Sequence, residues 1–164
     1  MVGTDFQRKV YLDLETFLED EELDDKFEVV NLGRKESILP SGKSVSPDVI
    51  IRVRESGEIR LRFGCKTSLR ERWKQDDRDA MLCGPDIPWV EMTEEEKPKS
   101  STDAIRKKCA SIKKNSSFAF VVSMFDRDGM NKMKKALLEL LVSNKSFAAL
   151  QESFLTETNA SLHP

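Results

Sequence analysis

An acid and a lysine stand at the outer ends of a segment with the pattern of a β-hairpin. Residues 49–53 are mostly β-branched, and in residues 59–63 apolar side chains alternate with arginines, as in a half-buried strand. Gly57 between them suits a tight turn, so the chain should fold back and place Asp48 beside Lys66. A carboxylate can bind Mg²⁺ and an ammonium can stabilise a phosphate, which together suit phosphodiester hydrolysis. A surface salt bridge is the alternative interpretation.

The residues that follow this lysine carry a denser pattern. The run GCKTSLRERWKQ, which ends at Gln75, and the later Arg78-Asp79-Ala80 resemble the catalytic segment of the EcoRII-type restriction endonucleases. These enzymes are a branch of the PD-(D/E)XK nuclease superfamily, and the resemblance extends loosely back to Pro47-Asp48. It implies that Asp48 is the metal-binding acid of the PD motif and that Lys66 is the motif lysine.

The second acid of the motif is displaced in this sequence. The superfamily usually places it two residues before the lysine, where this chain has Gly64. The EcoRII-type branch has a migrated acid on the following helix, and Asp79 stands at the matching position, with Asp76 and Asp77 as nearby alternatives. The resemblance therefore implies catalysis by Asp48, Lys66 and Asp79, with Mg²⁺ held by the two aspartates.

A charged triplet between the lysine and the expected helix matches the base-reading motif of the same branch. Arg70 and Arg72 could donate paired hydrogen bonds to guanine O6 and N7, and Glu71 could accept from cytosine amino groups. The resemblance thus implies recognition of a CC/GG element in the major groove. The alternative is a solvated helix start with mixed charges.

Composition and charge exclude several other classes of protein. The 164 residues have 38% hydrophobic and 34% charged side chains and a net charge of −2, with Lys and Arg concentrated in residues 52–74 and 106–114. The single histidine, His163, is the penultimate residue, which argues against Ser-His-Asp hydrolases and His-ligated zinc enzymes. The three cysteines have no CxxC spacing, which argues against a zinc ribbon. We expect carboxylates and lysine to carry any chemistry.

The rest of the chain predicts the elements that position these residues. Amphipathic or apolar periodicity predicts helices over 5–18, 102–114, 130–141 and 147–155, a strand over 26–32, a turn over 83–88, and a strand over 118–125 suited to the sheet centre. The first helix also offers Asp13, Glu15 and Glu19 as possible extra acids. We therefore predict one α/β domain over residues 1–164, with a restriction-endonuclease-like mixed central sheet flanked by helices.

The functional prediction is a Mg²⁺-dependent, sequence-specific endonuclease that acts on double-stranded DNA as a homodimer. A two-fold axis would match a palindromic site. No apolar run reaches the length of a membrane span and no signal peptide is evident, so we expect a cytoplasmic protein without a membrane partner. Two alternatives stay open, a structure-selective or repair nuclease of the same fold and a non-catalytic DNA-binding or assembly module.

Overall fold

A mixed β-sheet forms the centre of the computed structural model, which describes residues 2–33, 37–67, 73–84, 86–94 and 102–143. The strands of this sheet are β1 (Phe27–Asn31), β4 (Val49–Val53), β5 (Ile59–Lys66), β6 (Trp89–Thr93) and β7 (Phe120–Ser123), in the order β1-β4-β5-β6-β7. A separate two-stranded sheet pairs β2 (Ser37–Ile38) with β3 (Ser44–Val45). The helices are α1 (Val2–Asp20), α2 (Trp73–Cys83), α3 (Thr102–Lys114) and α4 (Arg127–Val142).

The sheet changes direction at its middle strand. β1, β4 and β5 are antiparallel neighbours, whereas β5, β6 and β7 run parallel. Parallel neighbours need a crossover, and α2 and α3 are the two crossover helices between β5, β6 and β7. Gly57 has φ +75° in the turn that joins β4 to β5, which confirms the predicted hairpin.

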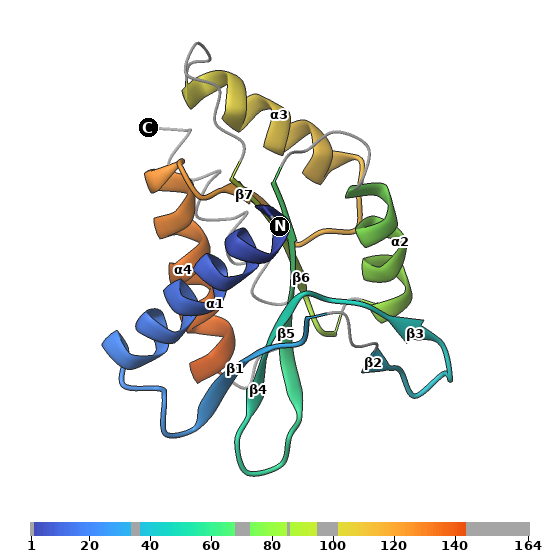
Figure 1. Ribbon diagram of the computed structural model, residues 1–164, viewed down its shortest axis with the longest axis vertical. Coiled ribbons are helices and arrows are strands. Elements are labelled where there is room, and N and C mark those ends of the chain that lie inside the picture. Colours follow the sequence, from blue (N-terminus) through green and yellow to red (C-terminus); the bar gives the residue numbers. More distant parts are fainter. Residues whose placement is uncertain (1, 34–36, 68–72, 85, 95–101, 144–164) are drawn as a thin grey trace.

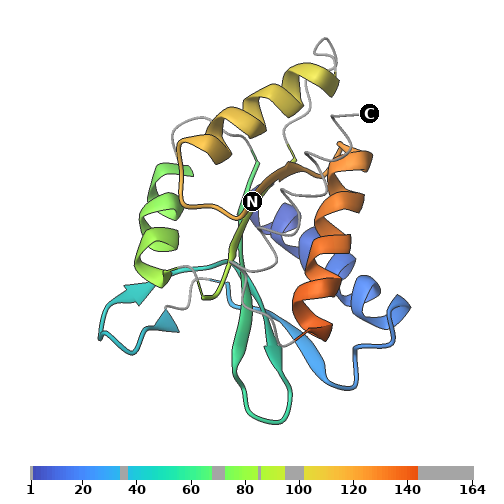
Figure 2. The ribbon, with the colours of Figure 1, turned by 180° about the vertical axis from the view of Figure 1, so that it is seen from behind.

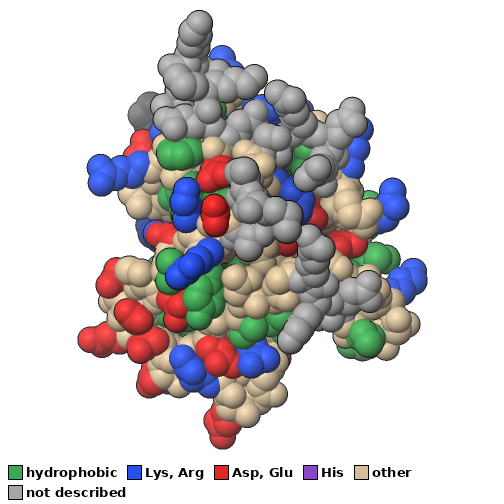
Figure 3. All heavy atoms as spheres, viewed as in Figure 1, with side chains coloured by type: hydrophobic (Ala, Val, Ile, Leu, Met, Phe, Trp, Pro, Cys, Tyr) green, Lys and Arg blue, Asp and Glu red, His purple; other side chains and the backbone are tan. Residues whose placement is uncertain are grey.

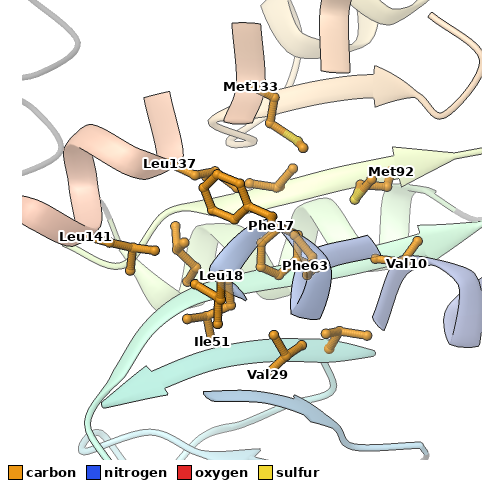
Figure 4. Packing of buried hydrophobic residues seen from close by; sticks show 14 of the residues in the cluster. Val10, Phe17, Leu18, Val29, Ile51, Phe63, Met92, Met133, Leu137 and Leu141 are labelled. Carbon is orange, nitrogen blue, oxygen red and sulfur yellow. The ribbon is translucent and has the colours of Figure 1, made fainter. Parts of the chain in front are cut away.

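The two faces of the sheet carry different helices. Helices α1 and α4 lie together on one side, and α2 and α3 lie on the other (Figures 1 and 2). The larger core fills the α1–α4 side, where alternate residues such as Ile51, Phe63 and Met92 meet Phe17 and Leu137 (Figure 4). A smaller cluster under α2 and α3 is built on Trp89 and Phe118.

One expectation about the sheet was wrong, and one strand was missed. The apolar run at 118–125 contains β7, which is an edge strand rather than the central one. The inner position belongs to β6, which the sequence analysis did not predict. All five residues of β6 are buried, as expected for a strand covered on both faces.

Three of the helix predictions are confirmed within the described residues. The helices expected at 5–18, 102–114 and 130–141 correspond to α1, α3 and α4. The helix expected at 147–155 lies outside the described residues, as does His163. Among the described residues, no helix is both long enough and apolar enough to cross a membrane.

Candidate active site

The hairpin places Asp48 beside Lys66, as its fold-back predicts. The amide of Asp48 donates to Phe63 O at 2.9 Å, so the pairing of β4 with β5 continues one residue beyond β4. Asp48 Oδ2 accepts a hydrogen bond from Cys65 N at 2.7 Å and lies 3.5 Å from Lys66 Nζ. These contacts fix the carboxylate at the end of the sheet, with its side chain 19% exposed.

A second acid reaches the same lysine from helix α2. Asp76 Oδ2 lies 3.2 Å from Lys66 Nζ, and the Asp76 side chain is only 7% exposed. Lys66 therefore contacts both carboxylates at once. Burial alone would lower the pKa of Lys66, but the charges of Asp76, Asp48 and Glu91 outweigh it and raise that pKa above its ordinary value.

Asp79, the acid that the resemblance implies, is placed elsewhere. It is buried, but its Oδ2 accepts a hydrogen bond from Ser46 N at 3.1 Å, and its Oδ1 lies 3.3 Å from Gln75 Nε2. It makes no ion pair with Lys66 among the described residues. Asp76, which the sequence left as an alternative, is the helical acid that the structure brings to the lysine. Asp77, the other alternative, accepts from Ser117 N instead.

Glu91 is the site residue that the sequence analysis missed. It lies on β6 directly opposite Gly64 in the parallel register, and it is fully buried. Neither of its carboxylate oxygens makes a hydrogen bond of good geometry with a described residue, and its polar neighbours there are Asp76, Trp89 and Lys66. Burial, reinforced by the negative charge of Asp76, raises the pKa of Glu91 well above its ordinary value. The available signal was a lone acid inside the short apolar run WVEMT, which is unusual for a buried strand.

Gly64 makes room for these acids. A Cβ at this position would collide with Glu91 Oε1 and would lie 2.5 Å from Asp76 Oδ2. Only a residue without a side chain leaves space for two carboxylates above β5. In the structure, the space above Gly64 is therefore filled by acids from the neighbouring strand and the neighbouring helix.

The candidate acids of α1 are not part of the group formed by Asp48, Lys66, Asp76 and Glu91. Asp13 pairs with Lys134 Nζ at 3.1 Å, between α1 and α4 on the opposite side of the sheet. Glu15 accepts a hydrogen bond from Tyr11, which raises the pKa of that tyrosine, and Glu19 is exposed. Other acids gather where α1 leads into β1 (Figure 3), and these form a solvated surface. The base-reading candidates Arg70, Glu71 and Arg72 lie outside the described residues.

The donor set fits a divalent cation. Among the described residues, no three Asp, Glu, His or Cys side chains are arranged as a metal site, and Lys66 lies between Asp48 and Asp76. However, Asp48, Asp76 and Glu91 supply only oxygen ligands, which Mg²⁺ prefers, and neither oxygen of the buried Glu91 has a hydrogen bond of good geometry to a described residue. Burial of such a group is costly without a compensating partner.

The comparisons with known proteins do not assign this chain to a family. No family model matches it, and neither a curated protein nor a solved structure matches it significantly.

Proposed function

We propose that this chain is a Mg²⁺-dependent endonuclease that hydrolyses phosphodiester bonds in double-stranded DNA, similar to the EcoRII-type restriction enzymes. The observation that carries the proposal is the position of Lys66, whose Nζ lies 3.5 Å from Asp48 and 3.2 Å from Asp76. An acid and a lysine at the ends of two neighbouring strands, with a second acid on the crossover helix beside them, are groups suited to this hydrolysis.

Asp48 and Asp76 would hold the metal. Bound Mg²⁺ would supply Lewis-acid stabilisation of the phosphate and lower the pKa of a water ligand. Asp48 is the fixed member of this pair, because the Cys65 amide orients its carboxylate. The Asp76 carboxylate is mostly shielded from water, which strengthens its interaction with a cation.

Lys66 has two tasks in this proposal. Its ammonium would orient the attacking water and stabilise the negative charge that develops on the phosphate. Without metal, the surrounding acids raise the pKa of Lys66, so its side chain is cationic at neutral pH. An ammonium can donate hydrogen bonds to a water and to phosphate oxygens. In the absence of metal, the same ammonium compensates the two aspartates.

Arg70, Glu71 and Arg72 would supply sequence recognition. They follow Lys66 closely in the sequence and precede α2, which carries Asp76. Paired hydrogen bonds from the arginines to guanine, and acceptance by Glu71 from cytosine, would select a CC/GG element. A palindromic site would be read by a homodimer with two-fold symmetry.

Incubation with plasmid DNA and Mg²⁺, followed by sequencing of the cut ends, tests the proposal. Discrete cuts at sites containing CC/GG, abolished by EDTA and by Lys66→Ala, are the expected result. Cuts restricted to junctions or flaps would assign the chain to structure-selective nucleases. Binding without cutting would leave a non-catalytic DNA-binding module and would contradict the proposal.

A matched test addresses base reading separately from cleavage. Arg72→Ala should reduce affinity for duplexes with CC/GG by roughly 10-fold or more while changing non-specific binding little. An equal loss of affinity for every duplex would show that Arg72 contacts phosphate and reads no base.

A further inference from the structure

The buried carboxyl group of Glu91 faces another acid, since its polar neighbours among the described residues are Asp76, Trp89 and Lys66. It comes from β6, the strand parallel to β5, and it lies on the sheet face covered by α2. Its side chain is 0% exposed, and neither oxygen makes a hydrogen bond of good geometry to a described residue. A carboxyl group buried beside another acid costs stability, so a structural role alone does not explain it.

The position of Glu91 matches the acid that the PD-(D/E)XK pattern lacks. The pattern usually has its second acid at the residue that is Gly64 here, and Glu91 is the Cα partner of Gly64 across the β5–β6 pair. Glu91 Oε1 lies where the Cβ of a side chain at position 64 would stand. The carboxylate is therefore delivered to the same space from the adjacent strand.

The charges around this space favour a divalent cation. Lys66 lies among Asp48, Asp76 and Glu91. Within the described residues, its positive charge offsets part of their negative charge. Full ionisation of the three acids beside one lysine would leave two negative charges uncompensated, which matches the charge of Mg²⁺. Exposure falls from Lys66 at 22% and Asp48 at 19% to Asp76 at 7%. An ion would enter past the first two side chains, with Glu91 at the buried end.

We propose that Glu91 is a third ligand of the metal held by Asp48 and Asp76. From the neighbouring strand, it would replace the motif acid that is missing at Gly64. This inference rests on the proposed function, because it concerns the metal of that same site. It differs from what the resemblance implies, because there the second acid of the motif lies on the following helix. It also explains why position 64 has no side chain.

Binding of Mn²⁺, measured by electron paramagnetic resonance or calorimetry without DNA, tests this inference independently of activity. Glu91→Gln keeps the shape of the side chain and removes its charge, so the fold should persist, as circular dichroism would verify. We expect Mn²⁺ affinity to fall at least about 10-fold, as is usual when a metal site loses supporting groups. Asp13→Asn, on the opposite side of the sheet, is the matched control and should bind as the wild type does.

A relocation variant tests the position of the carboxylate. Glu91→Gly combined with Gly64→Asp returns an acid to the motif position and should recover part of the Mn²⁺ affinity that Glu91→Gly alone loses. Wild-type affinity in Glu91→Gln would overturn the inference while leaving the endonuclease proposal intact if the wild type cuts DNA. Mn²⁺ binding that depends on Glu91, in a wild type that cuts no DNA, would support the metal site and contradict the endonuclease proposal.

Discussion

Lys66 Nζ lies 3.2 Å from Asp76 Oδ2, so the first turn of α2 supplies an acid that faces this lysine. Asp79, one turn later, is equally buried but accepts a hydrogen bond from the backbone of Ser46. The two aspartates therefore have different tasks. Asp76 belongs to the charged group, whereas Asp79 attaches α2 to the chain that leads into β4.

The first prediction concerns the coupling of Lys66 with Asp76. Lys66→Met leaves two acids without their cation and should lower the free energy of unfolding by roughly 1–3 kcal/mol in metal-free buffer. In a double-mutant cycle with Asp76→Asn, measured by urea unfolding, the coupling energy should reach about 1 kcal/mol or more.

The pair of Lys134 with Asp13 is the control for this cycle. Its atoms are as close, at 3.1 Å, but its side chains are 28% and 29% exposed. Water screens it more, so its coupling energy should be about 0.2–1 kcal/mol. Additive effects of Lys66→Met and Asp76→Asn would mean that their contact contributes nothing to stability.

The second prediction concerns the space above Gly64. Gly64→Ala should destabilise the fold by roughly 1–3 kcal/mol, because the new methyl group meets the carboxylates of Glu91 and Asp76. The penalty should be clearly smaller in a Glu91→Ala background, where the closest atom is gone. Equal penalties in the two backgrounds, measured by chemical unfolding, would show that Glu91 does not fill this space.

The third prediction concerns the start of α4. Asp126 caps this helix by accepting from Gly129 N, and it also accepts from Arg106. Asp126→Ala should lower the free energy of unfolding by about 1 kcal/mol through loss of the cap. Asp126→Asn keeps a capping oxygen, so it isolates the contribution of the charge.

The charge contribution of Asp126 should depend on pH. Burial acts to raise its pKa, but hydrogen bonds from Arg106 and Gly129 outweigh this and lower it below the ordinary value. The stabilisation is therefore complete above the unfolded pKa of about 3.9 and is lost as pH falls through the lower folded pKa. The stability difference between wild type and Asp126→Asn should be constant near neutral pH and shrink below about pH 4. A difference that grows on acidification would contradict this assignment.

Local patterns predicted the hairpin well. Alternation in β5 and the glycine at the turn predicted the hairpin that brings Asp48 near Lys66, and both signals are contained within the segment. They did not predict the bulge between Ile51 and Arg52, which shifts the register of the pair. The core face of α1 followed from helical spacing in the same way, since Phe6, Val10 and Leu14 are fully buried.

The remainder of the site depends on contacts between segments distant in sequence. The short apolar run of β6 carries no periodicity that separates a buried strand from a buried helix segment, so neither the strand nor the place of Glu91 was predicted. Which acid of α2 faces Lys66 depends on how the helix lies over the sheet, and its sequence alone does not determine that. The edge position of β7 likewise follows from strand order rather than from hydrophobicity.

Cleavage of supercoiled plasmid by Asp76→Asn and Asp79→Asn, side by side in Mg²⁺, tests the central claim most directly. Both substitutions lie in α2, keep the shape of a buried side chain and remove one charge. We predict that Asp76→Asn lowers the cleavage rate at least about 100-fold, whereas Asp79→Asn, which can still accept from Ser46, stays within about 10-fold of the wild type. Normal cleavage by Asp76→Asn together with an inactive, folded Asp79→Asn would contradict the assignment of Asp76, Asp48 and Lys66 as the hydrolytic centre.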